Sequence, residues 1–125
     1  MKHVRIDPVV LGITRKPITL PETDGDGQFV IDNGGNVVQF QATIVDLLKV
    51  MVTGYPRDKL TRLANINGDR LYGQCQDNVE DGVLSLEDNE YDWAIKTLEE
   101  HGTAIFGMQG YRVERALRDA VKELD

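Results

Sequence analysis

The sequence predicts one domain of the α+β class, in which short N-terminal antiparallel strands or hairpins precede three or four packed helices. Three observations lead to this prediction. The chain has 125 residues, residues 1–40 are rich in β-branched and turn-forming types, and later apolar residues recur at helical spacing. We therefore expect a single domain over 1–125, with a β-rich part at 1–40 and a helical part at 41–125.

The β-rich part contains two runs of turn-forming residues between apolar stretches. Residues 24–27 are Asp-Gly-Asp-Gly, and residues 32–36 are Asp-Asn-Gly-Gly-Asn. These residue types tolerate a positive φ or preset a turn. We expect a strand at 28–32, a tight turn at Asn33 to Asn36 and a strand at 37–40.

The first two helices are predicted on either side of Gly54. Apolar residues from Ile44 to Val52 form one stripe of a helix that ends near Gly54, and Pro56 suits the first turn of the next helix. That second helix covers about 57–73. Gly68 and its asparagine neighbours weaken its middle, so we expect a kink or break there.

Two further helices are predicted at 86 to about 100 and at about 111–124. Ser85, the only serine, has a hydroxyl that can accept hydrogen bonds from the exposed amides of the third helix. In the fourth helix, apolar residues at helical spacing should face the core, namely Val113, Leu117, Ala120, Val121 and Leu124.

Composition argues against several classes of protein. Fourteen Lys and Arg against twenty-one Asp and Glu give a net charge of -7, which disfavours direct nucleic-acid binding. The N-terminus lacks the apolar core of a signal peptide, and no apolar run reaches the roughly 18 residues of a spanning helix. We expect a soluble, intracellular protein without membrane contact.

The single cysteine, Cys75, allows neither an internal disulfide nor a thiolate zinc cluster.

Residues 77–100 carry nine acidic residues and a single basic one. Electrostatic complementarity lets such a face select a basic partner, so we predict a partner-binding face of Glu87, Asp88, Glu90, Asp92 and Trp93. The alternative is a solvated helix face that aids solubility. Trp93 and Tyr91 lie two residues apart and cannot both point into one core. Either one is exposed, or both lie partly buried at its edge.

Residues 77–88 have the spacing of a calcium loop, with Asp77, Asp81 and Asp88 at loop positions one, five and twelve. Val79 has no ligating oxygen, and Asp88 is one methylene shorter than the usual Glu. We therefore predict no metal site, and expect instead a loop that turns and caps the next helix with Ser85.

The sequence contains few combinations of residues that could carry out catalysis. A thiolate of Cys75 activated by His101 is conceivable, because His is the usual base for such a nucleophile. We expect instead that Cys75 lies at the edge of the core and that His101 lies at the C-terminus of a helix. The sequence has no nucleophile elbow, zincin helix, P-loop or dinucleotide fingerprint. We predict a non-enzymatic protein without a cofactor.

Apolar residues crowd the segment before the last helix, namely Ile105, Phe106, Met108, Tyr111 and Val113. One helix stripe cannot take all of them inward, so we predict self-association through this segment as a symmetric homodimer. The alternative is that Gly107 and Gly110 bend the segment so that both of its faces meet the core.

The order of parts resembles a set of small proteins from tailed bacteriophages and prophages. The resemblance covers Val38 to Val52, Leu60 to Tyr72 and Val83 to Leu117, and includes an Arg-Leu-Ala helix core and a Leu-Ser-Leu-Glu-Asp helix start. The turn region from Glu22 to Asn36 is longer than in that set. Most of these proteins have no assigned activity, so the resemblance implies phage origin and an accessory binding role.

These observations together predict a non-enzymatic, phage-encoded accessory protein. It would act by protein–protein contact, in virion assembly or on a host factor, in the host cytoplasm or associated with the virion. The alternative is an acidic inhibitor that mimics nucleic acid and blocks a basic groove of a host enzyme. An enzyme or a calcium-binding module has the least support.

Overall fold

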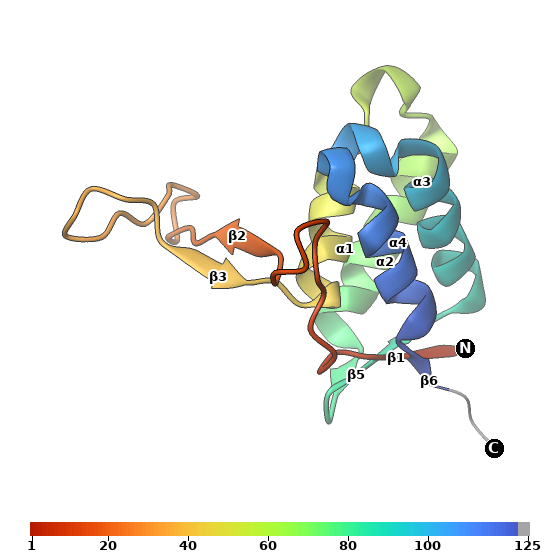
Figure 1. The fold of residues 1–125 in the computed structure, drawn as a ribbon. Helices are drawn as coiled ribbons and strands as arrows, with labels where there is room; N and C mark the ends of the chain where they lie inside the picture. Colours follow the sequence, from red (N-terminus) through yellow and green to blue (C-terminus); the bar gives the residue numbers. More distant parts are fainter. Residues whose placement is uncertain (123–125) are drawn as a thin grey trace.

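Four helices pack around one apolar core in the computed structural model, which describes residues 1–122 (Figure 1). The helices are α1 (Ile44–Thr53), α2 (Arg62–Asp77), α3 (Asp88–Phe106) and α4 (Gly110–Asp119), with 3-10 turns at Arg57–Lys59 and Gly107–Gln109. Buried side chains from all four meet in the core, among them Leu48, Leu71, Leu98 and Leu117. The α+β class with four helices is confirmed. Within the described residues, none of the helices combines the length and apolar character needed to cross a membrane.

Threonine caps determine where the first two helices begin. The Asp46 amide donates to Thr43 Oγ1, and the Thr43 amide donates to the Asp46 carboxylate. Thr61 accepts from the Ala64 amide in the same way. The second helix therefore begins at Arg62, later than predicted, and continues without a break to Asp77. The predicted break is wrong. Gly68 is buried where α2 packs against Val52 and Trp93, and a Cβ there would lie 3.3 Å from Val52 Cγ1, so close packing and not a kink accounts for the glycine.

A four-stranded antiparallel sheet closes one end of the helical body (Figure 1). Its order is β4 (Val79–Glu80), β5 (Val83–Leu86), β1 (Lys2–Arg5) and β6 (Val121–Lys122). Val4 lies opposite Leu84 on one side and Val121 on the other. The sheet thus joins the start of the chain to its middle and to the last described residues, and the predicted helical part supplies three of its four strands.

Strands β5 and β6 correct two predictions. Ser85 lies inside β5 and caps no helix, because Leu84 and Leu86 alternate into the core on either side of it. Helix α4 ends at Asp119, and Val121 belongs to β6. Leu124, predicted to face the core, lies outside the described residues.

An arm of residues 19–41 projects sideways from the helical body (Figure 1). At its base, β2 (Thr19–Pro21) pairs antiparallel with β3 (Gln39–Gln41). The predicted turn near Asn33 to Asn36 is present, closed by a bridge between Ile31 and Val37. The predicted strands at 28–32 and 37–40 are reduced to that bridge, a second bridge between Thr23 and Phe29, and β3, because this part of the chain turns twice within about fifteen residues.

Three backbone hydrogen bonds form a closed ring in the arm. The Glu22 amide donates to Val38 O at 2.8 Å, the Val38 amide to Val30 O at 2.8 Å, and the Val30 amide to Glu22 O at 2.9 Å. Each segment of this ring therefore bonds to the other two. The ring satisfies backbone groups in a part of the chain that has almost no buried side chains.

The two turns beyond this ring have the same construction. Asp24 Oδ1 accepts from the amides of residues 26 and 28, and Asp32 Oδ1 accepts from the amides of residues 34 and 36. Gly27 and Gly35 follow with φ of +79° and +81°, a conformation that favours glycine. Side-chain and backbone bonds thus fix both turns, which gives the arm a defined shape.

The α3–α4 corner depends on a close backbone approach. The chain bends at Gly107, and Gly110 at the start of α4 lies against the backbone of Gly102 in α3. A Cβ at Gly110 would lie 2.5 Å from the carbonyl carbon of Gly102, closer than any side chain fits.

We predict opposite effects for alanine at two helical glycines. Gly110→Ala should lower the free energy of unfolding by about 2 kcal/mol or more, since the helix backbones must separate. Gly73→Ala in α2 meets nothing within 4 Å and should raise it by about 0.5–1 kcal/mol. Urea denaturation measures both changes. A Gly110→Ala variant as stable as the wild type would contradict the close α3–α4 contact.

Candidate functional site

Glu90 is not part of an exposed acidic face. Its side chain is fully buried, and Arg70 Nε of α2 lies 2.8 Å from its Oε1 as an ion pair. Glu90 shares one stripe of α3 with Ala94 and Leu98, four and eight residues later, and that stripe faces the core. The prediction that Glu90 binds a partner is therefore wrong.

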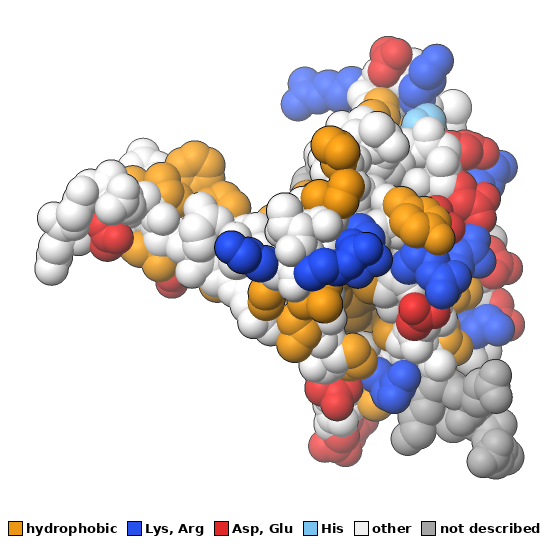
Figure 2. Space-filling view, viewed as in Figure 1, with side chains coloured by type: hydrophobic (Ala, Val, Ile, Leu, Met, Phe, Trp, Pro, Cys, Tyr) orange, Lys and Arg blue, Asp and Glu red, His pale blue; other side chains and the backbone are white. Residues whose placement is uncertain are grey.

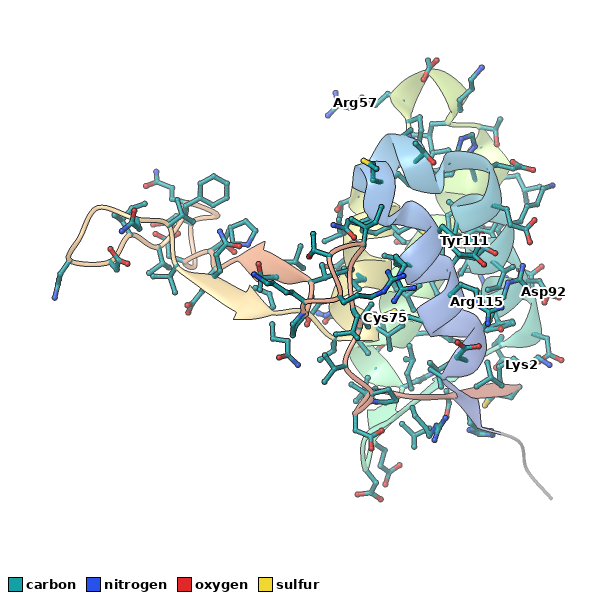
Figure 3. The ribbon with its side chains drawn as sticks, viewed as in Figure 1. Lys2, Arg57, Cys75, Asp92, Tyr111 and Arg115 are labelled. Atoms are coloured by element: carbon teal, nitrogen blue, oxygen red, sulfur yellow. The ribbon has the colours of Figure 1, made fainter. Side chains whose placement is uncertain are left out.

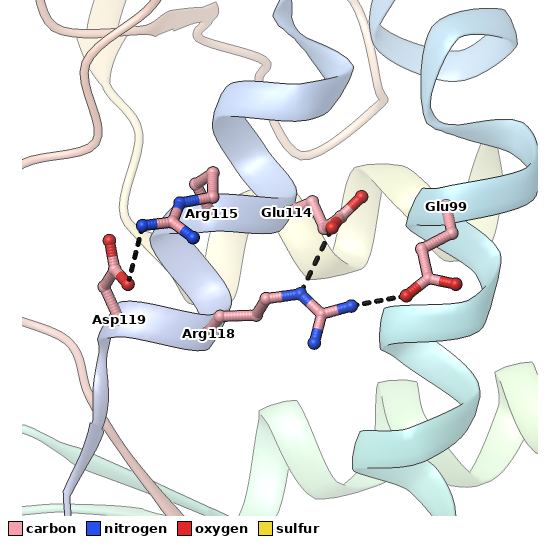
Figure 4. A network of polar contacts seen from close by, with 5 residues as sticks. All are labelled: Glu99, Glu114, Arg115, Arg118 and Asp119. Carbon is pink, nitrogen blue, oxygen red and sulfur yellow. Dashed lines mark hydrogen bonds and ion pairs between the residues drawn. The ribbon is translucent and has the colours of Figure 1, made fainter.

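Other acidic residues of 77–100 are paired with cations from distant parts of the chain. The Met1 amino group bonds to Asp88 at 2.9 Å, and this hydrogen bond holds the pKa of the Asp88 carboxyl below its usual value. Arg118 of α4 pairs with Glu99 and also with Glu114, at 3.1 Å from the latter (Figure 4). The acidic run in the sequence is thus partly neutralised. Glu87, Asp88 and Asp92 remain exposed, Asp88 in spite of its ion pair, and Asp92 lies on the side of the body opposite the arm (Figure 3).

Trp93 and Tyr91 both lie partly buried at the edge of the core. Trp93 stacks on Tyr55, with ring centroids 5.8 Å apart, and Lys2 Nζ lies 5.8 Å from the centre of the Tyr91 ring. Of the two alternatives, partial burial of both is confirmed, and a fully exposed aromatic residue is wrong. Trp93 lines a pocket of about 330 Å³ together with Gly68 and Tyr55.

Residues 77–88 do not form a loop between two helices. They comprise the end of α2, a hairpin of β4 and β5, and the start of α3. Asp81 and Gly82 make the two-residue hairpin turn, with φ of +52° and +74°. In the described part of the chain, no three His, Cys, Asp or Glu side chains are grouped to hold a metal ion.

The fold buries Cys75 and brings His3 beside Ser85. Cys75 is buried in the core, and burial raises the pKa of its thiol to about 11, against a smaller opposing effect of Lys49. His101 packs against the ring of Tyr55, with centroids 5.1 Å apart. His3 Nδ1 lies 3.1 Å from Ser85 Oγ across β1 and β5. Within residues 1–122, His3 has no hydrogen bond or ion pair with a carboxylate that would orient it as a base, whereas His101 Nε2 lies 3.8 Å from Glu100 Oε2.

The segment predicted to self-associate is divided by the bend at Gly107. Ile105 and Phe106 are partly buried against the core, and Val113 is fully buried. Met108 and Tyr111 remain exposed, with 75% and 64% of their surface accessible. The bend predicted as the alternative is present, yet it leaves two of the five apolar residues on the surface.

Tyr111 borders a cleft between α4 and the N-terminal segment at residues 8–11. The cleft has a volume of about 610 Å³, and Arg112 and Arg115 of α4 line it together with Tyr111, Val9 and Leu11. Arg112 Nε donates to Leu11 O at 3.2 Å, which holds the segment against the helix. Tyr111 and Arg115 are labelled on α4 in Figure 3. The cleft therefore combines an apolar floor with guanidinium groups.

The arm is another exposed apolar surface, and sequence reasoning did not identify it as a site. Phe29, Ile31 and Phe40 are exposed along it, Phe29 with 58% of its surface accessible. Hydrophobic side chains extend along the arm, and Lys and Arg side chains gather on the adjacent face of the body (Figure 2). The signal in the sequence that could have marked the arm as a site is its charge, because residues 17–41 contain four acidic residues and no Lys or Arg.

Comparison with family models, with curated proteins and with solved structures finds no match to this chain. The assignment to small proteins of tailed phages therefore stays a prediction from the sequence pattern.

Burial of Cys75 predicts a specific loss of stability at alkaline pH. The thiol titrates near 9 in the unfolded chain and near 11 in the folded protein. Between these values the unfolded chain has released the proton and the folded protein keeps it, so stability falls as pH rises. From pH 8 to 11 this group should lower the free energy of unfolding by about 2 kcal/mol.

Urea denaturation of the wild type and of Cys75→Ala over that range measures the effect. The variant is less stable at pH 8 because it leaves a small cavity, but its pH profile should lack this additional fall. If the free energies of unfolding of the wild type and of Cys75→Ala change in parallel with pH, the thiol is accessible in the folded protein. The hypothesis that a Cys75 thiolate acts as a nucleophile would then stand again.

Proposed function

We propose that this chain is a non-enzymatic protein that acts by protein–protein contact, with the arm as its contact element. The observation that carries the proposal is that Phe29 and Ile31 are exposed on an arm of defined shape, and that this arm projects from the helical body. Apolar side chains gathered outside the core mark interaction surfaces. A contact element that is already ordered loses little conformational entropy on binding.

The burial of Cys75 and the lack of a carboxylate that would orient His3 beside Ser85, within residues 1–122, support a non-enzymatic role. Cys75 is buried with a raised pKa, and His101 contacts Tyr55 instead. The sequence resemblance favours a phage-encoded accessory protein, which would meet a virion component or a host factor in the host cytoplasm. An acidic mimic of nucleic acid is less supported, since Glu90 is buried and Asp88 and Glu99 are paired.

Capture by immobilised protein tests the arm. We predict that Phe29→Ser with Ile31→Ser reduces capture of the partner from virions or host extract by about 30-fold or more, since central apolar anchors contribute about 2 kcal/mol or more. The matched control is Leu63→Ser, an apolar side chain on α2 with 67% of its surface accessible. All variants should unfold within about 0.5 kcal/mol of the wild type.

A further variant, Glu87→Lys with Asp92→Lys, tests the exposed remainder of the predicted acidic face. Loss of capture in the arm variant alone supports the proposal. Loss in the acidic variant, with normal capture by the arm variant, would contradict it and favour the acidic face. A captured capsid or tail protein would indicate assembly, and a nuclease or polymerase would indicate action on a host factor.

A further inference from the structure

We infer that the arm of one copy docks into the cleft between α4 and residues 8–11 of a second copy, so that the chain assembles head to tail. This inference rests on the proposed contact function and specifies the partner as another molecule of the same protein. The two surfaces differ from each other, so each copy offers one arm and one cleft.

The charges of the two surfaces are complementary. The arm carries Glu22, Asp24, Asp26 and Asp32 and has no basic residue. The cleft is lined by Arg5, Arg112 and Arg115 with one carboxylate, Asp119, which lies 3.7 Å from Arg115 as an exposed ion pair, so three guanidinium groups face one carboxylate. The N-terminal segment that leads to the arm adds Arg15 and Lys16. Opposite charge on otherwise apolar surfaces steers association and fixes orientation.

The apolar parts of the two surfaces also match. The arm presents Phe29 and Ile31, and the cleft presents Val9, Leu11 and Tyr111, all exposed in the single chain. A volume of about 610 Å³ lies within the range of about 300–1,000 Å³ in which proteins bind small apolar groups. An aromatic and an aliphatic side chain can therefore enter it, and the arginines would surround them as a charged rim.

A chain cannot fill its own cleft with its own arm. Leu11 and Val9 of the cleft belong to the segment that leads into the arm, and the arm points away from the body (Figure 1). The closed ring of Glu22, Val30 and Val38 opposes folding back. Contact between two different surfaces on separate copies is heterologous, and it generates rings or filaments instead of a symmetric dimer.

Mixing of two defective variants tests this geometry. The arm variant is Phe29→Ser with Ile31→Ser, and the cleft variant is Tyr111→Ser with Arg115→Glu. Light scattering up to about 100 μM, above the micromolar range of weak specific contacts, should give a mass above twice 14.0 kDa for the wild type and 14.0 kDa for each variant alone. An equimolar mixture should reach twice 14.0 kDa and no more, since one intact arm and one intact cleft remain.

Two controls carry matched changes outside both surfaces. Met108→Ser removes an exposed apolar residue near the same corner, and Arg57→Glu reverses a charge at a 3-10 turn. Both should assemble like the wild type. Thermal unfolding of every variant checks that it folds, and Tyr111→Ser alone replaces the cleft variant if Arg115→Glu impairs folding.

Three results would overturn the inference. In the first, the wild type stays at 14.0 kDa at every concentration. In the second, each variant alone is monomeric and their mixture stays monomeric too. In the third, the wild type forms a dimer that Met108→Ser abolishes. The proposed function is separable, because arm-dependent capture of another protein by a monomeric wild type would support it while rejecting self-assembly. If the wild type stays monomeric and the arm variant captures partner protein as well as the wild type does, both proposals are rejected.

Discussion

The pairing of β1 on both of its edges is the constraint on which the rest of the structure depends. β5 lies on one side and β6 on the other, and the Arg5 and Ile6 amides continue the bonding to Ala120 O and Gly82 O at 2.8 and 2.9 Å. The N-terminus is thereby fixed beside the end of α4. The chain then has to leave the sheet along α4, where Arg112 holds Leu11, before the arm begins. The cleft and the base of the arm are both consequences of this one pairing.

The arm itself is shaped by backbone bonding instead of by a core. The ring of Glu22, Val30 and Val38 and the two aspartate turns satisfy its polar groups locally. Side chains such as Phe29 are consequently not needed to stabilise it by burial, and they remain on the surface. This division of roles explains how a segment rich in β-branched residues can extend from the body with a defined shape. It also explains why its apolar residues are available to a second molecule.

Sequence periodicity predicted the helices well because their apolar stripes are long, as from Ile44 to Met51 in α1. Short strands were harder to predict, since β5 presents only the alternation of Leu84 and Leu86, which also suits a loop before a helix. The inclusion of Glu90 in the predicted acidic face was wrong for a spatial reason. Charge counted along the chain cannot reveal that Arg70 of α2 and the N-terminal amine lie beside Glu90 and Asp88. The cleft was equally hidden, because its walls come from residues about one hundred positions apart.

The central claim is that the arm and the cleft are two halves of one interface. Amide hydrogen exchange followed along the chain, at about 1 μM and at about 100 μM protein, tests it most directly because exchange reports local protection. The account predicts that residues 24–31 of the arm and residues 9–12 and 111–115 beside the cleft gain protection together as concentration rises, while the hairpin at 79–86 does not change. Protection that is independent of concentration in both regions, or that increases only around Met108, would contradict it.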